Sequence, residues 1–209
     1  MKQVLCFGDS NTYGLIPKKG GRYDWNIRWT GILNEKLDCE EFHVIEEGLC
    51  GRTTIFDDPL RDYRNGVKML PAILETNPDI DVIVLMLGTN DCKTVYGASA
   101  ELIGRGVERL LTIIKQHETD PEILLISPIH FGEKVWEKEY DPEFSVSSID
   151  TNEALAGVYE SVAEKENIHF LNAALIAEPS KEDHEHLDEK GHKALAEAVY
   201  EKILAMNIA

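Results

Sequence analysis

The chain has 209 residues, of which 43% are hydrophobic and 28% are charged. It is therefore long enough and apolar enough to bury a substantial core, and we expect one domain over residues 1–209. The formal net charge of −17 argues against nucleic acid or an anionic membrane as the main partner, because both need clustered lysine and arginine. No stretch approaches the roughly 20 apolar residues of a membrane span.

The cysteines form no C-x-x-C pair, so a zinc site or thioredoxin-like chemistry has little support. We interpret them as small buried residues: Cys6, Cys39, Cys50 and Cys92. The amino terminus runs directly into an apolar segment without a basic region or a cleavage site, so we expect no secretion signal. A reducing, cytoplasmic location fits these features best.

Short apolar runs alternate with segments of helical periodicity along the chain. The runs are rich in Val, Ile, Leu and Phe and lack polar alternation, which is typical of strands buried on both faces of a parallel sheet. They lie at Val4–Phe7, Phe42–Ile45, Val82–Leu87, Ile123–Ile126 and Ile168–Leu171. Apolar residues recur at helical spacing in 29–37, 102–114, 155–162 and 194–203. This alternation predicts an α/β fold, a doubly wound three-layer domain around a five-stranded parallel sheet.

The segment His130–Ile149 is the least regular part of the chain. It holds Trp136, Tyr140 and Phe144 among charged residues. We expect a loop insertion near one end of the sheet.

Three polar or glycine positions each follow a predicted strand. Ser10 follows the first strand, Gly51 the second and Asn90 the third. Ligands of open α/β sheets bind beyond the carboxyl ends of the strands, so these residues should meet in one crevice. The segment Asp183–His186, after the last predicted strand, should reach the same place.

Ser10 is the candidate nucleophile. Gly8 lets the chain turn sharply out of the strand, although a serine at this place is also a common turn or cap residue. A serine hydroxyl needs an adjacent base before it can attack an ester. His186 is the candidate base and Asp183 its orienting carboxylate. A rival pairing stays open, because the chain also offers His184, His192 and Asp188 nearby.

Asn90 is the candidate oxyanion donor, because its side-chain amide can donate to the negative charge that develops on a tetrahedral intermediate. The backbone N–H groups of Ser10 and Gly51 could donate as well, and one such donor contributes on the order of 3 kcal/mol. Gly51 and Asn90 could each instead be an ordinary turn residue between a strand and a helix.

Several other signatures are absent. The chain has no Gly-x-Ser-x-Gly nucleophile elbow and no P-loop or H-E-x-x-H zinc motif. Asp57-Asp58-Pro59 is more typical of a turn than of a metal pair. We therefore expect no metal ion.

Taken as a set, these residues resemble the SGNH hydrolases, a subgroup of the GDSL esterase/lipase superfamily that is named for a serine, a glycine, an asparagine and a histidine. The four blocks stand in the family's order: Gly8-Asp9-Ser10, Cys50-Gly51-Arg52, Gly88-Thr89-Asn90-Asp91 and Asp183-x-x-His186. The resemblance implies a flavodoxin-like arrangement of the sheet and a Ser10, His186 and Asp183 triad. It also implies an oxyanion hole formed by Ser10, Gly51 and Asn90.

A narrower resemblance points to the bacterial arylesterase/acyltransferase branch, which includes perhydrolases. It is carried by Arg28-Trp29-Thr30-Gly31, Val44–Leu49, Arg52-Thr53-Thr54 and Asp57-Asp58-Pro59. The branch implies short acyl chains, aryl or alkyl ester substrates, no cofactor and a homo-oligomer. This chain departs from the branch at Asn11 and Tyr13, where leucine and tryptophan are usual, and in the charged segment 130–149.

The sequence thus favours a serine esterase that forms an acyl-enzyme on Ser10, with acyltransferase or perhydrolase activity as an extension. One alternative is a carbohydrate esterase that removes acetyl groups from sugars, since aromatic residues of 130–149 could stack on a sugar ring. Another is a binding module without catalysis, which would require the intact triad to be a coincidence. Four aromatic residues are candidates for the substrate pocket: Tyr13, Trp25, Phe56 and Trp136.

Overall fold

The computed structural model describes residues 1–38, 40–116, 120–206 and 208. At its centre is a parallel five-stranded sheet with the strand order β2-β1-β3-β4-β5. The strands are β1 (Lys2–Gly8), β2 (Phe42–Gly48), β3 (Ile80–Met86), β4 (Glu122–Ser127) and β5 (His169–Asn172). The predicted parallel sheet is confirmed, and its order is that of the flavodoxin-like class of doubly wound folds.

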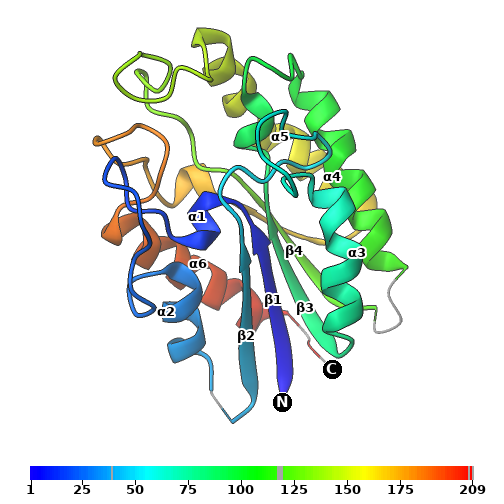
Figure 1. Ribbon diagram of the computed structural model, residues 1–209. Coiled ribbons are helices and arrows are strands. Elements are labelled where there is room, and N and C mark those ends of the chain that lie inside the picture. Colours follow the sequence, from blue (N-terminus) through cyan, green and yellow to red (C-terminus); the bar gives the residue numbers. More distant parts are fainter. Residues whose placement is uncertain (39, 117–119, 207, 209) are drawn as a thin grey trace.

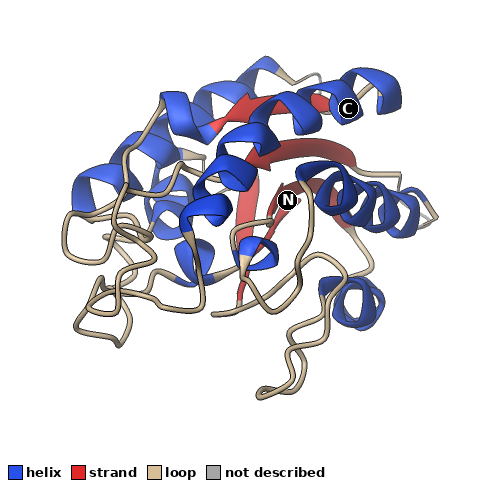
Figure 2. Ribbon diagram, turned by 90° about the horizontal axis from the view of Figure 1, so that it is seen from above, coloured by secondary structure: helices blue, strands red, loops and turns tan. Residues whose placement is uncertain are grey.

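Helices cover both faces of the sheet (Figures 1 and 2). On one face α2 (Trp29–Lys36) packs against α6 (Glu189–Ala205), and on the other α4 (Ala100–Lys115) packs against both α3 (Gly66–Thr76) and α5 (Val146–Glu166). Three short helices follow strands: α1 (Ser10–Tyr13), η1 (Asn90–Cys92) and η2 (Ala173–Leu175). Figure 1 shows both termini at one end of the sheet and the loops that follow β1, β2 and β3 at the other.

Alternate residues of each central strand enter different layers of the core. In β1, Val4 and Cys6 belong to the cluster with α2 and α6, whereas Leu5 and Phe7 belong to the cluster with α3, α4 and α5. All four are fully buried, which explains why the run shows no polar alternation. The edge strand β2 differs, because it continues past the predicted Ile45 through partly exposed residues to Gly48.

Two helices differ from the sequence-based expectations. The apolar periodicities do not reveal α3, which carries Pro71 in its interior, a residue that normally breaks a helix. Helix α5 begins at Val146 with a capping box between Ser145 and Ser148, so the last four residues of the predicted insertion 130–149 are helical. The remainder, up to Ser145, is loop and turn.

The cysteines that the structure describes are free thiols. Cys6 and Cys92 are buried and Cys50 is half-buried, while Cys39 lies outside the described residues. Among the described residues, no helix combines the length and the apolar character needed to cross a membrane.

A buried histidine, His192, joins α6 to α2. Its Nδ1 accepts a hydrogen bond from the Trp29 N–H at 3.3 Å, and its ring meets Tyr23 edge-on. Its Nε2 has no hydrogen-bond partner among the described residues. Burial lowers the pKa of His192 to about 4, so the ring is neutral at physiological pH.

Candidate active site

Ser10 begins helix α1, immediately after β1. Asp9 caps this helix, since its Oδ1 accepts the Asn11 N–H at 3.0 Å. Gly8 is required by the tightness of the turn, because a Cβ there would lie 2.1 Å from Thr12 Oγ1. The turn places Ser10 at the carboxyl end of the sheet, with 3% of its surface exposed.

Ser10, His186 and Asp183 form a continuous hydrogen-bonded chain. The distance from Ser10 Oγ to His186 Nε2 is 2.9 Å, and His186 Nδ1 lies 2.8 Å from Asp183 Oδ2. Asp183 Oδ1 also accepts the backbone N–H groups of Glu185 and His186, at 3.1 and 3.0 Å. The Lys18 N–H donates to Asp183 Oδ2 at 3.3 Å. These contacts fix the carboxylate and orient the imidazole toward the serine.

Asn11 connects the serine helix to the histidine loop. Its Oδ1 accepts the Leu187 N–H at 2.8 Å, and this bond is buried. The residue next to Ser10 is thereby tied to the residue next to His186. The arylesterase branch usually has leucine at this position, and in this chain Asn11 uses its side-chain oxygen for a contact across the site.

We expect Asn11→Ala to reduce both stability and turnover. The buried Leu187 N–H would lose its acceptor, which costs about 1–3 kcal/mol in the free energy of unfolding. Loss of the tie should also lower kcat about 10- to 100-fold, because small displacements of catalytic groups are costly. Urea unfolding and ester hydrolysis measure the two effects. Asn34→Ala is the control, since the Asn34 side chain likewise accepts a backbone N–H, that of Val44 on the edge strand β2. This control variant should lose stability without a loss of kcat. Equal kcat in both variants would refute the role of Asn11.

Charge around His186 favours its protonated form. Burial alone lowers the pKa of the imidazolium, but the carboxylates of Glu185 and Asp183 outweigh burial and raise the pKa of His186 to about 9. Burial opposes ionisation of Asp183 as well, yet the hydrogen bond with His186 keeps the pKa of Asp183 below its ordinary value. The pair is therefore an ionised carboxylate beside a strongly basic imidazole.

This basicity predicts an alkaline rate profile. A general base must be unprotonated, and each pH unit below its pKa reduces the unprotonated fraction about tenfold. Because the pKa of His186 is raised from about 6.5 to about 9, kcat/KM should still climb between pH 7 and pH 9. Steady-state hydrolysis of p-nitrophenyl acetate from pH 6 to 10 measures this. A plateau already reached at pH 7 would contradict the prediction.

The rival histidines lie elsewhere. His184 has a left-handed backbone with φ of 62°, and its ring packs edge-on against Tyr140 with centroids 4.6 Å apart. His192 points into the core beside Trp29. Of the three histidines, His186 is the one that is hydrogen-bonded to Ser10.

Gly51 and Asn90 follow β2 and β3, the two strands that pair with β1 on either side. Gly51 has φ of 83°, a left-handed backbone conformation that favours glycine. Within the described part of the chain its N–H donates to no hydrogen bond. The Asn90 side-chain nitrogen donates to Arg52 O at 3.1 Å, and its second N–H stays available to another acceptor.

Two residues that the sequence reasoning did not single out hold this region together. Buried Asp91 accepts the Thr54 N–H at 2.9 Å and also the Thr54 hydroxyl, and burial raises the pKa of Asp91 to about 7. The Arg52 guanidinium donates to Gly8 O at 2.9 Å and lies 4.1 Å from the ring centre of Phe7. Asp91 directly follows Asn90 in the Gly88-Thr89-Asn90-Asp91 motif, and this position is the sequence feature that could have identified Asp91.

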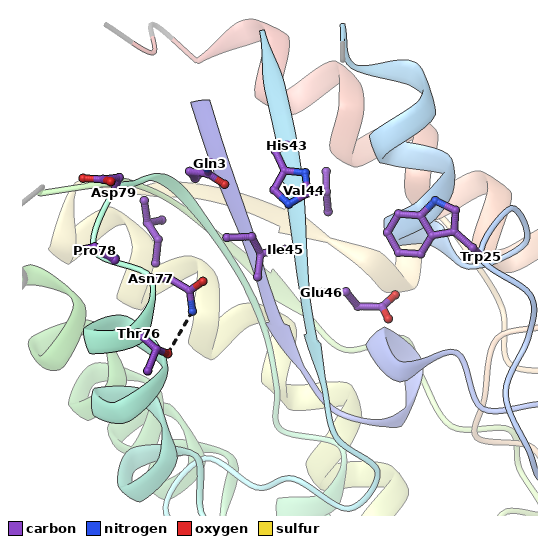
Figure 3. Close-up of a pocket in the computed structure, with 11 residues that line it drawn as sticks. Gln3, Trp25, His43, Val44, Ile45, Glu46, Thr76, Asn77, Pro78 and Asp79 are labelled. Atoms are coloured by element: carbon purple, nitrogen blue, oxygen red, sulfur yellow. Dashed lines mark hydrogen bonds between the residues drawn. The ribbon is translucent and has the colours of Figure 1, made fainter. Parts of the chain in front are cut away.

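The four aromatic pocket candidates do not gather at one place. Trp25 borders a cavity of about 570 Å³ along the edge strand β2, whose lining includes neither Ser10 nor His186 (Figure 3). Tyr13 lies beneath the Arg22 guanidinium, and Phe56 stacks on Tyr96 with ring centres 4.8 Å apart. Trp136 is 40% exposed on the 130–149 segment. A substrate-binding role remains a hypothesis for each.

No group of three or more His, Cys, Asp or Glu side chains suitable for a metal ion occurs within residues 1–38, 40–116, 120–206 and 208. The chemistry that the described geometry supports is nucleophilic attack by an activated serine beside hydrogen-bond donors.

Comparison with known proteins agrees with this geometry. The GDSL-like Lipase/Acylhydrolase family model matches residues 6–194. The isoamyl acetate-hydrolyzing esterase of Saccharomyces cerevisiae is 24% identical over 171 residues, which span 79% of this chain and 66% of the yeast protein.

Two solved structures resemble the whole chain more closely. A carbohydrate acetylesterase family member from Sinorhizobium meliloti is 32% identical, with a TM-score of 0.90 and 98% of each chain covered. The aryl esterase of M. smegmatis is 31% identical, with a TM-score of 0.89 and 98% and 99% of the two chains covered. The sequence resemblance to the SGNH hydrolases is confirmed, and the chain belongs to the GDSL-like lipase/acylhydrolase family.

Proposed function

We propose that the protein is a serine esterase that hydrolyses short-chain aryl or alkyl esters through an acyl-enzyme on Ser10. The hydrogen-bonded chain from Ser10 through His186 to Asp183 is the observation that supports this assignment most directly. The esterases among the relatives agree with it.

In the proposed mechanism, Ser10 Oγ attacks the ester carbonyl while His186 Nε2 takes its proton. The N–H groups of Ser10 and Gly51 and the free N–H of Asn90 hold the oxyanion. His186 then donates the proton to the departing alcohol, which leaves an acyl group on Ser10. Water attacks this acyl-enzyme with His186 again as base, and Asp183 stays ionised throughout.

The test is hydrolysis of p-nitrophenyl esters from acetate to octanoate, together with labelling by an organophosphonate. Activity that peaks at acetate or butyrate, with covalent label on Ser10, is expected. A protein that hydrolyses none of the esters and takes no label would contradict the proposal and favour a binding module.

Acyl transfer could proceed from the same acyl-enzyme intermediate. An alcohol or hydrogen peroxide in place of water would attack the acyl-enzyme and give a new ester or a peracid. The resemblance to the arylesterase/acyltransferase branch supports this proposal. Product analysis in mixtures of water and a short alcohol would measure the ratio of transfer to hydrolysis.

Deacetylation of sugars is a second candidate. It is favoured by the 32% identity to the Sinorhizobium meliloti protein and by exposed Trp136 on a segment that could stack against a sugar ring. Comparing acetylated sugars with aryl acetates distinguishes the two functions.

We also propose that the protein acts in the cytoplasm as a homo-oligomer. The free thiols of the described cysteines support a reducing compartment, and the arylesterase resemblance supports assembly. Light scattering on the purified protein measures the oligomeric state.

A further inference from the structure

Glu185 places a second carboxylate beside the imidazole of His186. Its Oε1 lies 3.7 Å from His186 Nε2, which is the nitrogen that faces Ser10. Asp183, in contrast, binds the opposite nitrogen, Nδ1. Apart from raising the pKa of His186, Glu185 has no role in the mechanism above, although it lies beside the nitrogen that takes and returns the proton.

This carboxylate is buried with His186 as its ion-pair partner. Glu185 is 5% exposed, yet neither of its side-chain oxygens accepts a hydrogen bond from a described residue. A carboxylate offers acceptor sites alone, and a hydrogen bond to a charged acceptor is stronger than one between neutral groups. Such a group beside a reacting atom is suited to accept a hydrogen bond from a bound substrate.

The part of the substrate that meets Glu185 is the alcohol. During acyl-enzyme formation the ester oxygen of the leaving group must come within hydrogen-bond distance of Nε2 to receive its proton. Atoms attached next to that oxygen then lie beside Oε1. In a vicinal diol the second oxygen is about one hydrogen-bond length from the first, so one alcohol can face both Nε2 and Oε1.

We propose that Glu185 determines specificity for the leaving alcohol by accepting a hydrogen bond from a neutral hydroxyl next to the ester, as in a partially acylated polyol or sugar. This inference rests on the proposed esterase function and narrows its substrate class.

Neighbouring charges favour a neutral hydroxyl over a charged group. Lys93 is buried, and its positive charge and the negative charge of Asp141 both act on Glu185. The Lys93 ammonium, which is ion-paired with Glu143 at 2.6 Å, disfavours a cationic alcohol, and Glu185 itself repels an anionic one. Burial raises the pKa of Glu185 to about 7. Above that pH a hydroxyl avoids both repulsions and forms a charge-assisted hydrogen bond with the carboxylate.

Two esters of matched length test the proposal: 2-hydroxyethyl acetate and propyl acetate, which differ by a hydroxyl in place of a methyl group. We expect the wild type to prefer the hydroxyl ester in kcat/KM by about tenfold or more, the value of a hydrogen bond to a charged group. In Glu185→Leu the ratio should fall to about one. Because both esters are compared on the same variant, a change in the pKa of His186 affects both rates equally and leaves their ratio unchanged.

Glu185→Gln keeps the shape of the side chain and provides a second variant if the leucine variant does not fold; its ratio should lie between the other two. Glu182→Gln is the matched control, an equivalent change in the same loop, and should keep the wild-type ratio. Choline acetate tests the cationic alternative.

A wild-type ratio near one, a ratio that persists in both Glu185 variants, or a preference for choline acetate over 2-hydroxyethyl acetate would each overturn the inference. If Ser10-dependent hydrolysis of p-nitrophenyl acetate remains in those cases, the proposed esterase function stands. If no ester is hydrolysed, both fail together.

Discussion

Replacing Ser10 by alanine should reduce ester hydrolysis at least about 10⁴-fold, because members of a triad act as a unit and loss of the nucleophile removes the acyl-enzyme pathway. The side chain is small and its hydroxyl bonds to His186, so the fold should survive. The measurement is kcat/KM for p-nitrophenyl acetate, with circular dichroism to verify folding.

Ser161→Ala is the control for Ser10→Ala. Its hydroxyl donates to Gly157 O on the exposed face of α5, so activity should be unchanged. Mass spectrometry after treatment with an organophosphonate should find the label on wild type and on Ser161→Ala but not on Ser10→Ala. A folded Ser10→Ala variant with wild-type turnover would remove Ser10 from the mechanism.

Replacing Asn90 by alanine should lower kcat by about 10²–10³-fold with a smaller change in KM. A side-chain donor in an oxyanion hole acts mainly in the transition state, where its loss costs about 2.7–4 kcal/mol. The variant also loses the hydrogen bond to Arg52 O, so some stability should be lost as well. Steady-state kinetics and thermal unfolding separate the two effects.

Asn152→Ala is the control that separates a loss of catalysis from a loss of stability. Asn152 is also a buried amide, and it accepts the Phe131 N–H at 2.9 Å and donates to Ile129 O. Its loss should destabilise the protein without a comparable loss of kcat. If the two variants show the same kcat at equal folded fraction, Asn90 is not an oxyanion donor.

The parallel sheet, and a site at the carboxyl ends of its strands, are predicted by local features of the sequence. Runs such as Val4–Phe7 are uniformly apolar because both of their faces are covered, and polar residues directly after such runs must lie at the carboxyl edge of the sheet. That placement predicts that Ser10, Gly51 and Asn90 share one region. Helix α3 was not visible because Pro71 contradicts its pattern.

The remaining features of the site depend on long-range contacts. The choice of His186 over His184 and His192 depends on backbone direction, such as the left-handed turn at His184, which spacing does not encode. The tie from Asn11 to Leu187 joins residues 176 positions apart. Trp25 borders a cavity at the edge of β2, and its role in substrate binding stays a prediction.

The buried ring of His192 has a consequence for the acid tolerance of the fold. Its pKa is about 4 in the native protein and about 6.5 in an unfolded chain, so between these values the unfolded state takes up a proton that the native state refuses. By linkage, the contribution of His192 makes unfolding easier as the pH falls from 6.5 toward 4, whereas the raised pKa values of buried Asp91 and Glu185 act in the opposite direction over this range. His186 acts on the rate, since its proton must be lost before Ser10 is activated. Acidification therefore stops turnover through His186, while His192, six residues further along the chain, opposes the two buried carboxyls in setting the stability of the fold.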